Sequence, residues 1–394
     1  MKKLLFIHGA EKVKEDEDGN LYTDGSYPSN IWNRYKIISN DITVMFRKDK
    51  KIYTKSDAKI KYNILDKKIS FVELEDILDS IKSYVSISKR NKNKRKIEDA
   101  VKKCDYLIAR VPSACSYLAI DFAIKYHKPY IIEVVGCTWD SLWNYGIKGK
   151  ILAFPSFLKQ KKYVKKAENV IYVSNRFLQE RYPSNGKQIS CSDVILNKID
   201  DSCLEKRLKK INSNSFNNKL VVGTLGGIDV TFKGQQYVIK AIKKLKEKGI
   251  NIEYQVAGAG TGDRLLTLAK KENVEDCFKI IGSIPHEKVG EWLQNIDIYI
   301  QPSNQEGLCR SIIEAMSCAC PIIASNAGGN IELIDNKYIF KKKHVNELID
   351  KIELMFNKNE MQKEAKKNFA NSKDYDIKLI DKRREDFFKD FTKL

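Results

Sequence analysis

Two glutamates, Glu306 and Glu314, flank the predicted start of a helix over Ser311–Cys318. A strand is expected over Asp297–Gln301, so the chain passes here from strand to loop to helix. The first turn of a helix has unpaired N–H groups and a positive dipole end, which together bind phosphate groups. At about 1.5 Å per residue, the two carboxylates lie on the order of 12 Å apart. That span is close to the distance from the sugar to the ribose of a nucleotide-sugar, so the segment predicts a site for such a ligand.

Both glutamates also have a purely structural interpretation. Ser311 and Glu314 have the spacing of a helix capping box, in which the glutamate satisfies backbone N–H groups. Glu306 is equally explained as an exposed acid in a loop. The residues alone leave both interpretations open, and the choice depends on the surrounding sequence.

The elements that must position these residues alternate between short apolar segments and longer amphipathic ones, which is typical of parallel α/β layers. Right-handed crossovers stack such a series into a doubly wound sheet with ligands at the carboxyl ends of the strands. In the first half we expect strands at Lys3–His8, Ile42–Phe46, Tyr106–Ala109, Tyr130–Val135 and Val170–Val173, and helices at Glu73–Ser83 and Tyr117–Tyr126. In the second half we expect strands at Leu220–Thr224, Glu253–Ala257, Phe278–Ile281, Asp297–Gln301 and Pro321–Ala324, and helices at Tyr237–Lys248, Arg264–Glu272, Glu287–Gln294 and Ser311–Cys318.

The length of 394 residues is too great for one ordinary core and suits two domains. The periodic pattern stops at Ile211–Asn218, a polar stretch that we interpret as a linker. We therefore expect an acceptor-binding domain over residues 1–212 and a donor-binding domain over residues 213–376. The remaining residues, 377–394, form a basic amphipathic helix that we expect to cross back to the first domain.

Composition limits the cellular setting and the partners. The longest apolar runs are far shorter than a membrane span, and Met1–Gly9 lacks the features of a signal peptide, so it is interpreted as a first strand. Nine cysteines, an odd number with no Cys-x-x-Cys pair, favour a reducing cytoplasm and argue against a zinc site. The formal charge of +20 leaves nucleic acid, an anionic membrane surface and phosphorylated substrates as partner classes, beside a basic surface that is merely solvated.

The second half resembles the retaining glycosyltransferases of family 4, which carry a Glu-x7-Glu motif. Glu306 and Glu314 occupy its two positions, and Glu314 is followed by Ala-Met as in that family. Four further stretches match the family's loops in the same order. They are Gly223-Thr-Leu-Gly226-Gly227 with Lys233-Gly234, Ala257-Gly258-x-Gly260, Ile281-Gly-Ser-Ile284-Pro285, and Pro321 through Gly328-Gly329 to Glu332-Leu333.

This resemblance implies a GT-B fold, in which two Rossmann-like domains face each other across a cleft, and transfer of a hexose from UDP or GDP. It implies that Glu306 contacts the transferred sugar, Glu314 the ribose and Lys233 the diphosphate, where a cation stabilises the departing charge. Ile284 would line the base pocket through its backbone, although core packing explains it equally, and Lys233 could be an ordinary surface lysine. The remaining donor-binding positions implied are Gly226, Gly227, Gly258, Gly307, Leu308 and Cys309.

The chain departs from the family at two positions. Gly227 stands where many relatives carry an arginine, and Arg310 could supply that charge or simply face solvent. Val135 stands where many relatives carry a cleft histidine. His8, at the end of the first strand, is the substitute we consider for a catalytic role, against a structural histidine. Weaker candidates are Asp140, Glu133 and the loop at Gly25-Ser26.

No metal and no cofactor are expected, because the nucleotide-sugar is a substrate and the Asp-x-Asp near the start of the chain lies far from the nucleotide motifs. The acidic run Glu15–Asp18 contains an Asp-x-Asp, which we interpret as a solvated hairpin tip. The segment Ile147–Lys166 places Phe154, Phe157 and Tyr163 among seven lysines. Such a segment could lie on anionic lipid at the inner face of the plasma membrane, where a lipid-linked acceptor is found, or pack its rings into the core.

The preferred hypothesis is thus a cytoplasmic hexosyltransferase whose partners are a nucleotide-sugar donor and a glycan or lipid-linked acceptor. The resemblance places it in the synthesis of bacterial surface polysaccharide, such as capsule or lipopolysaccharide. A nucleotide-sugar 2-epimerase of the same fold is the alternative enzyme. A nucleic-acid-binding protein is the non-enzymatic alternative, but Lys89–Lys96 is the only dense basic run, so we expect no nucleic acid.

Overall fold

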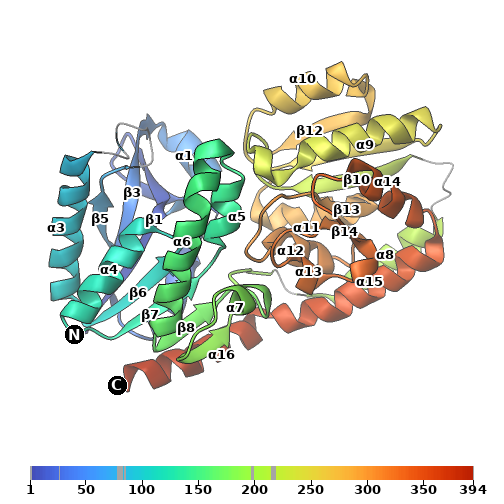
Figure 1. Cartoon of the computed structure of the whole chain (residues 1–394). Helices are drawn as coiled ribbons and strands as arrows, with labels where there is room; N and C mark the ends of the chain where they lie inside the picture. Colours follow the sequence, from blue (N-terminus) through green and yellow to red (C-terminus); the bar gives the residue numbers. More distant parts are fainter. Residues whose placement is uncertain are drawn as a thin grey trace.

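The computed structural model describes residues 2–25, 27–77, 83, 86–196, 199–213 and 219–393. The chain forms two α/β halves that lie side by side, each built around its own sheet (Figure 1). Both termini lie in the first half, because the last helix runs back from the second half along one edge of the molecule.

The first sheet is centred on β1 (Lys3–Asp16), whose parallel neighbours lie on both sides. From one edge to the other the parallel order is β5-β3-β1-β6-β7-β8-β9, and the short strands β2 and β4 add an antiparallel extension to β1. The remaining strands are β2 (Leu21–Thr23), β3 (Asp41–Tyr53), β4 (Asn63–Ile64), β5 (Ser70–Leu74), β6 (Tyr106–Val111), β7 (Tyr130–Val134), β8 (Asn169–Tyr172) and β9 (Lys187–Ser190).

The two faces of the first sheet are covered by different helices because neighbouring side chains of a strand point to opposite faces. Leu5 and Ile7 of β1 pack toward the helices drawn in front of the sheet in Figure 1. Phe6 points to the other face, where its ring lies 5.5 Å from that of Trp32 and 5.1 Å from that of Tyr35. The helices of this half are η1 (Ser29–Arg34), α1 (Lys55–Lys61), α3 (Ile87–Lys103), α4 (Ala114–Lys125), α5 (Thr138–Trp143), α6 (Gly146–Lys166) and α7 (Phe177–Arg181).

The second sheet is entirely parallel, with the order β12-β11-β10-β13-β14-β15. Numbered from its own first strand, this is the order 3-2-1-4-5-6 of nucleotide-binding sheets, in which the winding reverses between the first and fourth strands. The strands are β10 (Leu220–Leu225), β11 (Ile252–Ala257), β12 (Phe278–Gly282), β13 (Ile298–Gln301), β14 (Ile322–Ser325) and β15 (Ile339–Phe340).

Helices cover the second sheet on both sides, and two of them link it to the rest of the chain. The buried Arg207 of α8 donates to the carbonyl oxygens of Leu293 and Ile296, so α8 packs on the second half. The helices are α8 (Asp201–Ser213), η2 (Thr231–Lys233), α9 (Gln235–Glu247), α10 (Asp263–Lys271), η3 (Glu275–Cys277), α11 (His286–Asn295), α12 (Arg310–Ser317), α13 (Asn330–Leu333), η4 (Asn336–Tyr338), α14 (Val345–Leu354), α15 (Lys358–Ser372), η5 (Lys373–Tyr375) and α16 (Ile377–Thr392).

The helix α16 leaves the second half and packs on the first (Figure 1). The ring of Phe388 lies 6.0 Å from that of Tyr35, and the ring of Phe391 lies 5.4 Å from that of Tyr106. Arg384 is buried and donates to the carbonyl oxygen of Ser192 at 3.1 Å. This helix therefore fastens the end of the chain to the first sheet.

The expected α/β fold with parallel sheets is confirmed, and three details of the sequence analysis are corrected. Glu73 lies in β5 because Phe71, Val72 and Leu74 extend the sheet, and most of the helix expected at 73–83 lies outside the described residues. Asp16 is not solvated: it is 2% exposed and accepts hydrogen bonds from Tyr22 and Asn20 that hold the turn.

The predicted linker begins too early. Ile211 is 3% exposed within α8, where it packs into the core of the second half, and residues 214–218 lie outside the described residues. The predicted domain boundary between 212 and 213 therefore falls inside α8. Because α8 packs on the second half, its contacts favour a boundary near Asp201.

Candidate active site

The loops that follow β10 and β13 meet at one edge of the second sheet, where the winding of the sheet reverses. Ligands of open parallel sheets bind at this position, because the two crossovers diverge and leave a crevice. The loop after β10 carries Gly226, Gly227 and Lys233, and the loop after β13 carries Glu306 and leads into α12. A cavity of about 710 Å³ opens here and is lined by residues of both halves.

Lys233 and Glu306 form a close ion pair in this cavity. The Lys233 Nζ lies 2.7 Å from the Glu306 Oε1, which also accepts a hydrogen bond from the Ser303 hydroxyl at 2.6 Å. Burial alone would lower the pKa of Lys233, but the Glu306 carboxylate outweighs it and raises this pKa. The ammonium therefore stays charged and is held where the predicted diphosphate and sugar would meet.

Glu314 lies further along α12 and faces the same cavity. Burial raises the pKa of its carboxyl, and the charges of Arg310 and His286 oppose this rise. The His286 Nε2 lies 3.8 Å from the Glu314 Oε1. The capping-box alternative is wrong: Cys309 is the N-cap residue without a side-chain hydrogen bond, and the Ser311 hydroxyl donates instead to the Gln301 Oε1 at 3.2 Å.

Arg310 begins α12 and reaches from the second half to the first. Its Nη1 donates to the Gly25 carbonyl oxygen at 3.0 Å, and the residue lines the cavity. The positive charge thus lies beside the helix start that would hold a diphosphate, in the same cavity as Gly227. Ser26, the other member of the predicted Gly25-Ser26 loop, lies outside the described residues.

Two glycines allow the backbone to pass where a side chain would collide. Gly234, directly after Lys233, has φ +79°, and a Cβ there would run into the Pro302 carbonyl group. Gly307 approaches the first half so closely that a Cβ would meet the Val135 carbonyl oxygen. The family's glycines at these positions therefore have a steric reason in this chain.

The predicted donor-binding residues fall into two groups. Three of them do not line the cavity: Gly258 supports the loop at Gly226, Ile284 packs against the core, and Gly307 touches the first half. The roles of all these residues stay predictions. The predicted site residues that do line the cavity are Gly226, Gly227, Lys233, Glu306, Leu308, Cys309, Arg310 and Glu314.

His8 lies at the end of the regular part of β1 but does not line the cavity. Its Nδ1 is 2.7 Å from the Tyr27 hydroxyl oxygen. Burial, and then the charge of Arg110, lowers the pKa of His8 to about 3, so the imidazole is neutral at physiological pH. These contacts are those of a structural histidine, and its catalytic role stays a prediction.

Comparison with known proteins decides the family. The sequence profile described as "Glycosyl transferases group 1" matches residues 205–372. The chain is also 33% identical to Protein CapJ of Staphylococcus aureus over 399 aligned residues, covering 100% of this chain and 96% of CapJ. The chain belongs to the group 1 glycosyl transferases.

Two further similarities concern parts of this glycosyltransferase or its fold. It is 32% identical to the amylovoran biosynthesis glycosyltransferase AmsK of Erwinia amylovora over 111 residues, which is 26% of this chain and 27% of AmsK. The structure of HepE from Anabaena in complex with UDP-glucose superposes with a TM-score of 0.63 at 15% identity, over 99% of this chain and 100% of HepE. At that identity the likeness establishes the fold, which is the GT-B arrangement of two facing Rossmann-like domains.

The first half of this glycosyltransferase contributes a wall of the cavity, of which the sequence had singled out only the loop at Gly25. No motif precedes the other wall residues, and only topology brings them opposite α12. His286 was missed in the second half, although it directly follows the Ile281–Pro285 stretch that the family resemblance identified. The lining residues of the first half are Gly25, Pro28, Ser29, Asn30, Asn63, Asp193 and Ile195.

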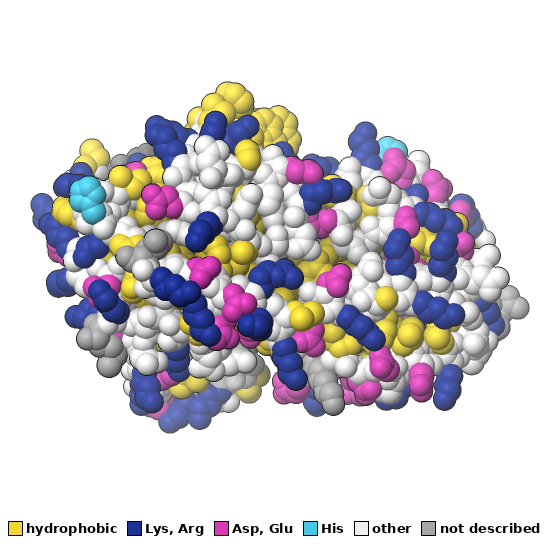
Figure 2. All heavy atoms as spheres, turned by 90° about the horizontal axis from the view of Figure 1, so that it is seen from below, with side chains coloured by type: hydrophobic (Ala, Val, Ile, Leu, Met, Phe, Trp, Pro, Cys, Tyr) yellow, Lys and Arg dark blue, Asp and Glu magenta, His cyan; other side chains and the backbone are white. Residues whose placement is uncertain are grey.

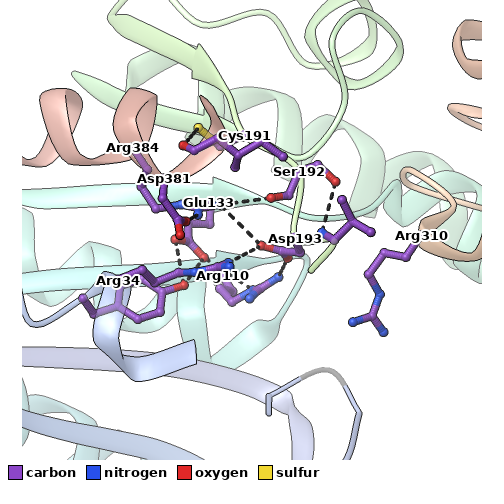
Figure 3. Close-up of polar contacts among 12 residues, drawn as sticks. Arg34, Arg110, Glu133, Cys191, Ser192, Asp193, Arg310, Asp381 and Arg384 are labelled. Carbon is purple, nitrogen blue, oxygen red and sulfur yellow. Dashed lines mark hydrogen bonds and ion pairs between the residues drawn. The ribbon is translucent and has the colours of Figure 1, made fainter. Parts of the chain in front are cut away.

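Behind this wall lies a buried cluster of charges contributed by distant parts of the chain (Figure 3). Arg110 forms a short hydrogen bond to the Asp193 Oδ2, and its Nε lies 3.5 Å from the Glu133 Oε2. Arg34 and Arg384 face Asp193 at 3.6 and 3.9 Å. Glu133, one of the weaker sequence candidates, is thus part of this cluster and does not line the cavity.

Three further observations concern parts of the described chain outside this cavity. Within the described ranges, no group of three or more His, Cys, Asp or Glu side chains is placed to hold a metal ion. Asp140, another weak candidate, pairs with Arg181 at 3.6 Å outside the cavity. Among the described residues, no helix is both long enough and apolar enough to span a bilayer.

Proposed function

We propose that this glycosyltransferase is a retaining, metal-independent hexosyltransferase that uses a UDP- or GDP-sugar and a glycan or lipid-linked acceptor. The observation that carries this proposal is the Lys233–Glu306 pair, 2.7 Å apart at the reversal point of the sheet, with Glu314 in the same cavity. A cation, a hydrogen-bonding carboxylate and a second carboxylate beyond a helix start are the groups that a diphosphate, a hexose and a ribose require. The family assignment supports transfer over the 2-epimerase alternative.

In this proposal the site works mainly by positioning and electrostatics. Negative charge develops on the diphosphate as the glycosidic bond breaks, and Lys233 and Arg310 lie where they would stabilise it. Glu306 would orient the sugar through its hydroxyl groups, since its Oε1 is already fixed by Lys233 and Ser303. Two protein cations in the proposed phosphate site support a mechanism without a bound metal ion.

The choice of donor and of pathway rests on the relatives. HepE, which shares the fold, binds UDP-glucose, and this makes UDP the first nucleotide to test. AmsK is an amylovoran biosynthesis glycosyltransferase, so the similarity to its sequence supports synthesis of a bacterial surface polysaccharide. The sugar acceptor would then enter between the first-half wall and α12.

Calorimetric titration of the purified protein with UDP, GDP and CMP, with and without EDTA, tests the donor site. We expect one nucleoside diphosphate to bind equally well in both conditions, and Glu314→Ala to weaken it by at least tenfold because the ribose loses its acceptor. Glu287→Ala is the matched control, since Glu287 is an exposed glutamate on α11. Loss of binding on addition of EDTA would contradict metal independence, and no binding by any of the three nucleotides would contradict the donor site.

The acceptor side of the proposal includes the inner face of the plasma membrane. At one edge of the first half, hydrophobic side chains form a protrusion flanked by basic ones, on the side where α6 is drawn foremost (Figures 1 and 2). Phe157 and Tyr163 of the predicted amphipathic segment pack against the core, whereas Phe154 is 57% exposed. The other exposed hydrophobic residues of α5 and α6 and the turn between them are Trp143, Tyr145, Ile147, Ile151, Leu152 and Leu158.

An apolar protrusion surrounded by lysines suits the surface of an anionic bilayer, which supplies both burial and opposite charge. The proposal predicts that the protein sediments with phosphatidylglycerol vesicles and much less with phosphatidylcholine vesicles. Ile147→Glu and Ile151→Glu together should abolish sedimentation, whereas Ile124→Glu, at an exposed isoleucine of α4, should not. Equal sedimentation of both variants would contradict this membrane surface.

A further inference from the structure

Asp193 is the one charged residue that the first half contributes to the wall of the cavity, among the described residues. It follows β9 and faces the same space as Lys233 and Glu306 of the second half. Its side chain is 16% exposed, so it is accessible from the cavity although most of it is covered. No family motif and no expectation from the sequence had singled it out.

Three arginines from three separate elements hold this carboxylate in place. Arg110 comes from β6, Arg34 from η1 and Arg384 from α16, and all three are buried (Figure 3). Burial opposes ionisation of Asp193, but the charges of Arg110, Arg34 and Arg384 outweigh it and lower its pKa to about 2. The carboxylate is therefore ionised at every physiological pH.

The two oxygens of Asp193 have different partners. The Oδ2 accepts the short hydrogen bond from Arg110. The Oδ1 has only the longer ion pairs, at 3.6 Å to Arg34 and 3.9 Å to Arg384, and accepts no hydrogen bond from the described residues. A carboxylate oxygen readily accepts hydrogen bonds from hydroxyl groups, so this oxygen can take one from a ligand in the cavity.

The rest of the first-half wall combines polar groups with Pro28 and Ile195 and carries no positive charge within the described residues, since the cations of the cavity, Lys233 and Arg310, come from the second half. Ser29, Asn30 and Asn63 offer a hydroxyl and two amides, which suit sugar hydroxyls. The arginines behind Asp193 do not line the cavity themselves. An acceptor on this wall therefore meets one fixed negative charge and neutral hydrogen-bonding groups.

We infer that Asp193 binds a hydroxyl group of the acceptor sugar and makes this wall selective for neutral or amino sugars over uronic acids. This inference rests on the proposed function, because it places the acceptor opposite the donor loops. Asp193 takes no proton in this role, since so weak a base cannot deprotonate a hydroxyl group. It orients the acceptor oxygen and repels a carboxylate on the acceptor by like charge.

The inference is tested with octyl β-glucoside and octyl β-glucuronide, which differ by one carboxylate, titrated into the full-length protein and followed by NMR in the presence of UDP. The wild-type protein is expected to bind the glucoside at least tenfold more tightly than the glucuronide. Asp193→Asn should weaken glucoside binding by about tenfold and bring the ratio of the two affinities close to one. Glu133→Gln is the matched control, because it removes a carboxylate from the same buried cluster but not from the cavity wall.

Each outcome bears on the inference. A ratio near one in the wild-type protein, no glucoside binding, or an unchanged ratio in Asp193→Asn would overturn it. If Asp193→Asn does not fold, the wild-type titrations are repeated at high salt concentration: screening of the Asp193 charge should strengthen glucuronide binding while binding of the uncharged glucoside stays the same, and failure to do so overturns the inference. Calorimetry of UDP binding on the same samples separates the two proposals, since loss of donor binding concerns the second-half site alone.

Discussion

At the scale of single residues, the Lys233 ammonium is held 2.7 Å from a Glu306 oxygen in a cavity between the two halves. The same ammonium would face the diphosphate of a bound donor, whose charge grows in the transition state. Lys233→Ala is therefore expected to lower kcat by about 100- to 1000-fold, with a smaller change in KM. The measurement is the initial rate of nucleoside diphosphate release.

Lys243→Ala is the control for this prediction, because Lys243 pairs with Glu272 at 3.2 Å outside the cavity. An equal loss of rate in both variants would mean that Lys233 acts through stability rather than through charge. A rise in KM with kcat unchanged would likewise contradict a role in the transition state.

Under the proposed function, donor binding is expected to depend on pH through Glu314. Burial raises the pKa of its carboxyl above that of an ordinary glutamate, against the opposing charges of Arg310 and His286. A carboxylate is ionised above its pKa and loses its charge as the pH falls through that value. Because the ionised form is the better acceptor for ribose hydroxyls, UDP affinity is expected to fall on acidification while an ordinary glutamate would still be ionised. Calorimetry over a pH series measures this, and Glu314→Gln should give a weaker and pH-independent affinity.

The residues that the sequence predicted and those that it missed differ in a physical way. Lys233 and Glu306 lie in the segments that directly follow two strands, and Glu314 lies in the helix after the second of these segments, so their positions follow from the local order of strand, loop and helix. Asp193 owes its ionisation to side chains that are distant in the sequence, such as Arg384 of the last helix. No spacing rule connects such residues, and only the folded chain brings them together.

At the scale of elements, α15 contains two glutamates with opposite environments. Glu364 is 1% exposed, and burial raises its pKa to about 7, whereas Glu360 pairs with Lys337 and the Tyr338 hydroxyl, which lower its pKa. A raised pKa in the folded state means that stability is highest below the ordinary pKa and falls as pH rises through the folded value. For Glu364 the loss lies between about pH 4.5 and pH 7 and amounts to about 3 kcal/mol.

Glu364→Gln is thus expected to raise the melting temperature at pH 8 and to change it little at pH 4.5, since glutamine cannot ionise. Glu360→Gln is the matched control on the same helix, with the opposite sign. The ion pair of the Glu360 carboxylate with Lys337 stabilises the folded protein at pH values above the ordinary glutamate pKa. Glu360→Gln should therefore melt at a lower temperature than the wild type at pH 8. Thermal unfolding of both variants at the two pH values checks the prediction, and a destabilising effect of Glu364→Gln at pH 8 would refute it.

Most elements were predictable because short buried strands and amphipathic helices follow one another with clear apolar periods. The ends of the strands were harder to predict. β1 continues beyond His8 to Asp16, where Val13 and Lys14 are both buried, and β2 pairs with this extension. The polar stretch near Ile211 resembled a linker, yet tertiary contacts of Arg207 keep its first residues helical. Local composition cannot report such long-range contacts.

At the scale of the whole molecule, the two halves are joined at several points besides the chain itself. Arg310 of the second half bonds to the Gly25 carbonyl at the cavity, and α16 crosses to the first half (Figure 1). A third contact involves Glu332 of α13, whose carboxylate accepts three backbone hydrogen bonds at the start of α7. The donors are the N–H groups of Asn175 at 2.7 Å and of Arg176 and Phe177 at 2.9 Å. This carboxylate therefore ties α13 of the second half to the start of α7 in the first half.

Hydrogen bonds to a charged group contribute about 1.5–3 kcal/mol each at most, and Glu332→Ala removes all three between the halves at once. The variant is expected to open the cleft, which small-angle X-ray scattering would detect as a larger radius of gyration, and to lower kcat because domain closure positions the donor and the acceptor. Glu347→Ala is the control, since Glu347 accepts the Lys341 N–H at 2.7 Å within the second half alone. If Glu332→Ala keeps the wild-type radius of gyration and kcat, the halves are held together by α16 and the cavity contacts. The Glu332 carboxylate would then only cap α7.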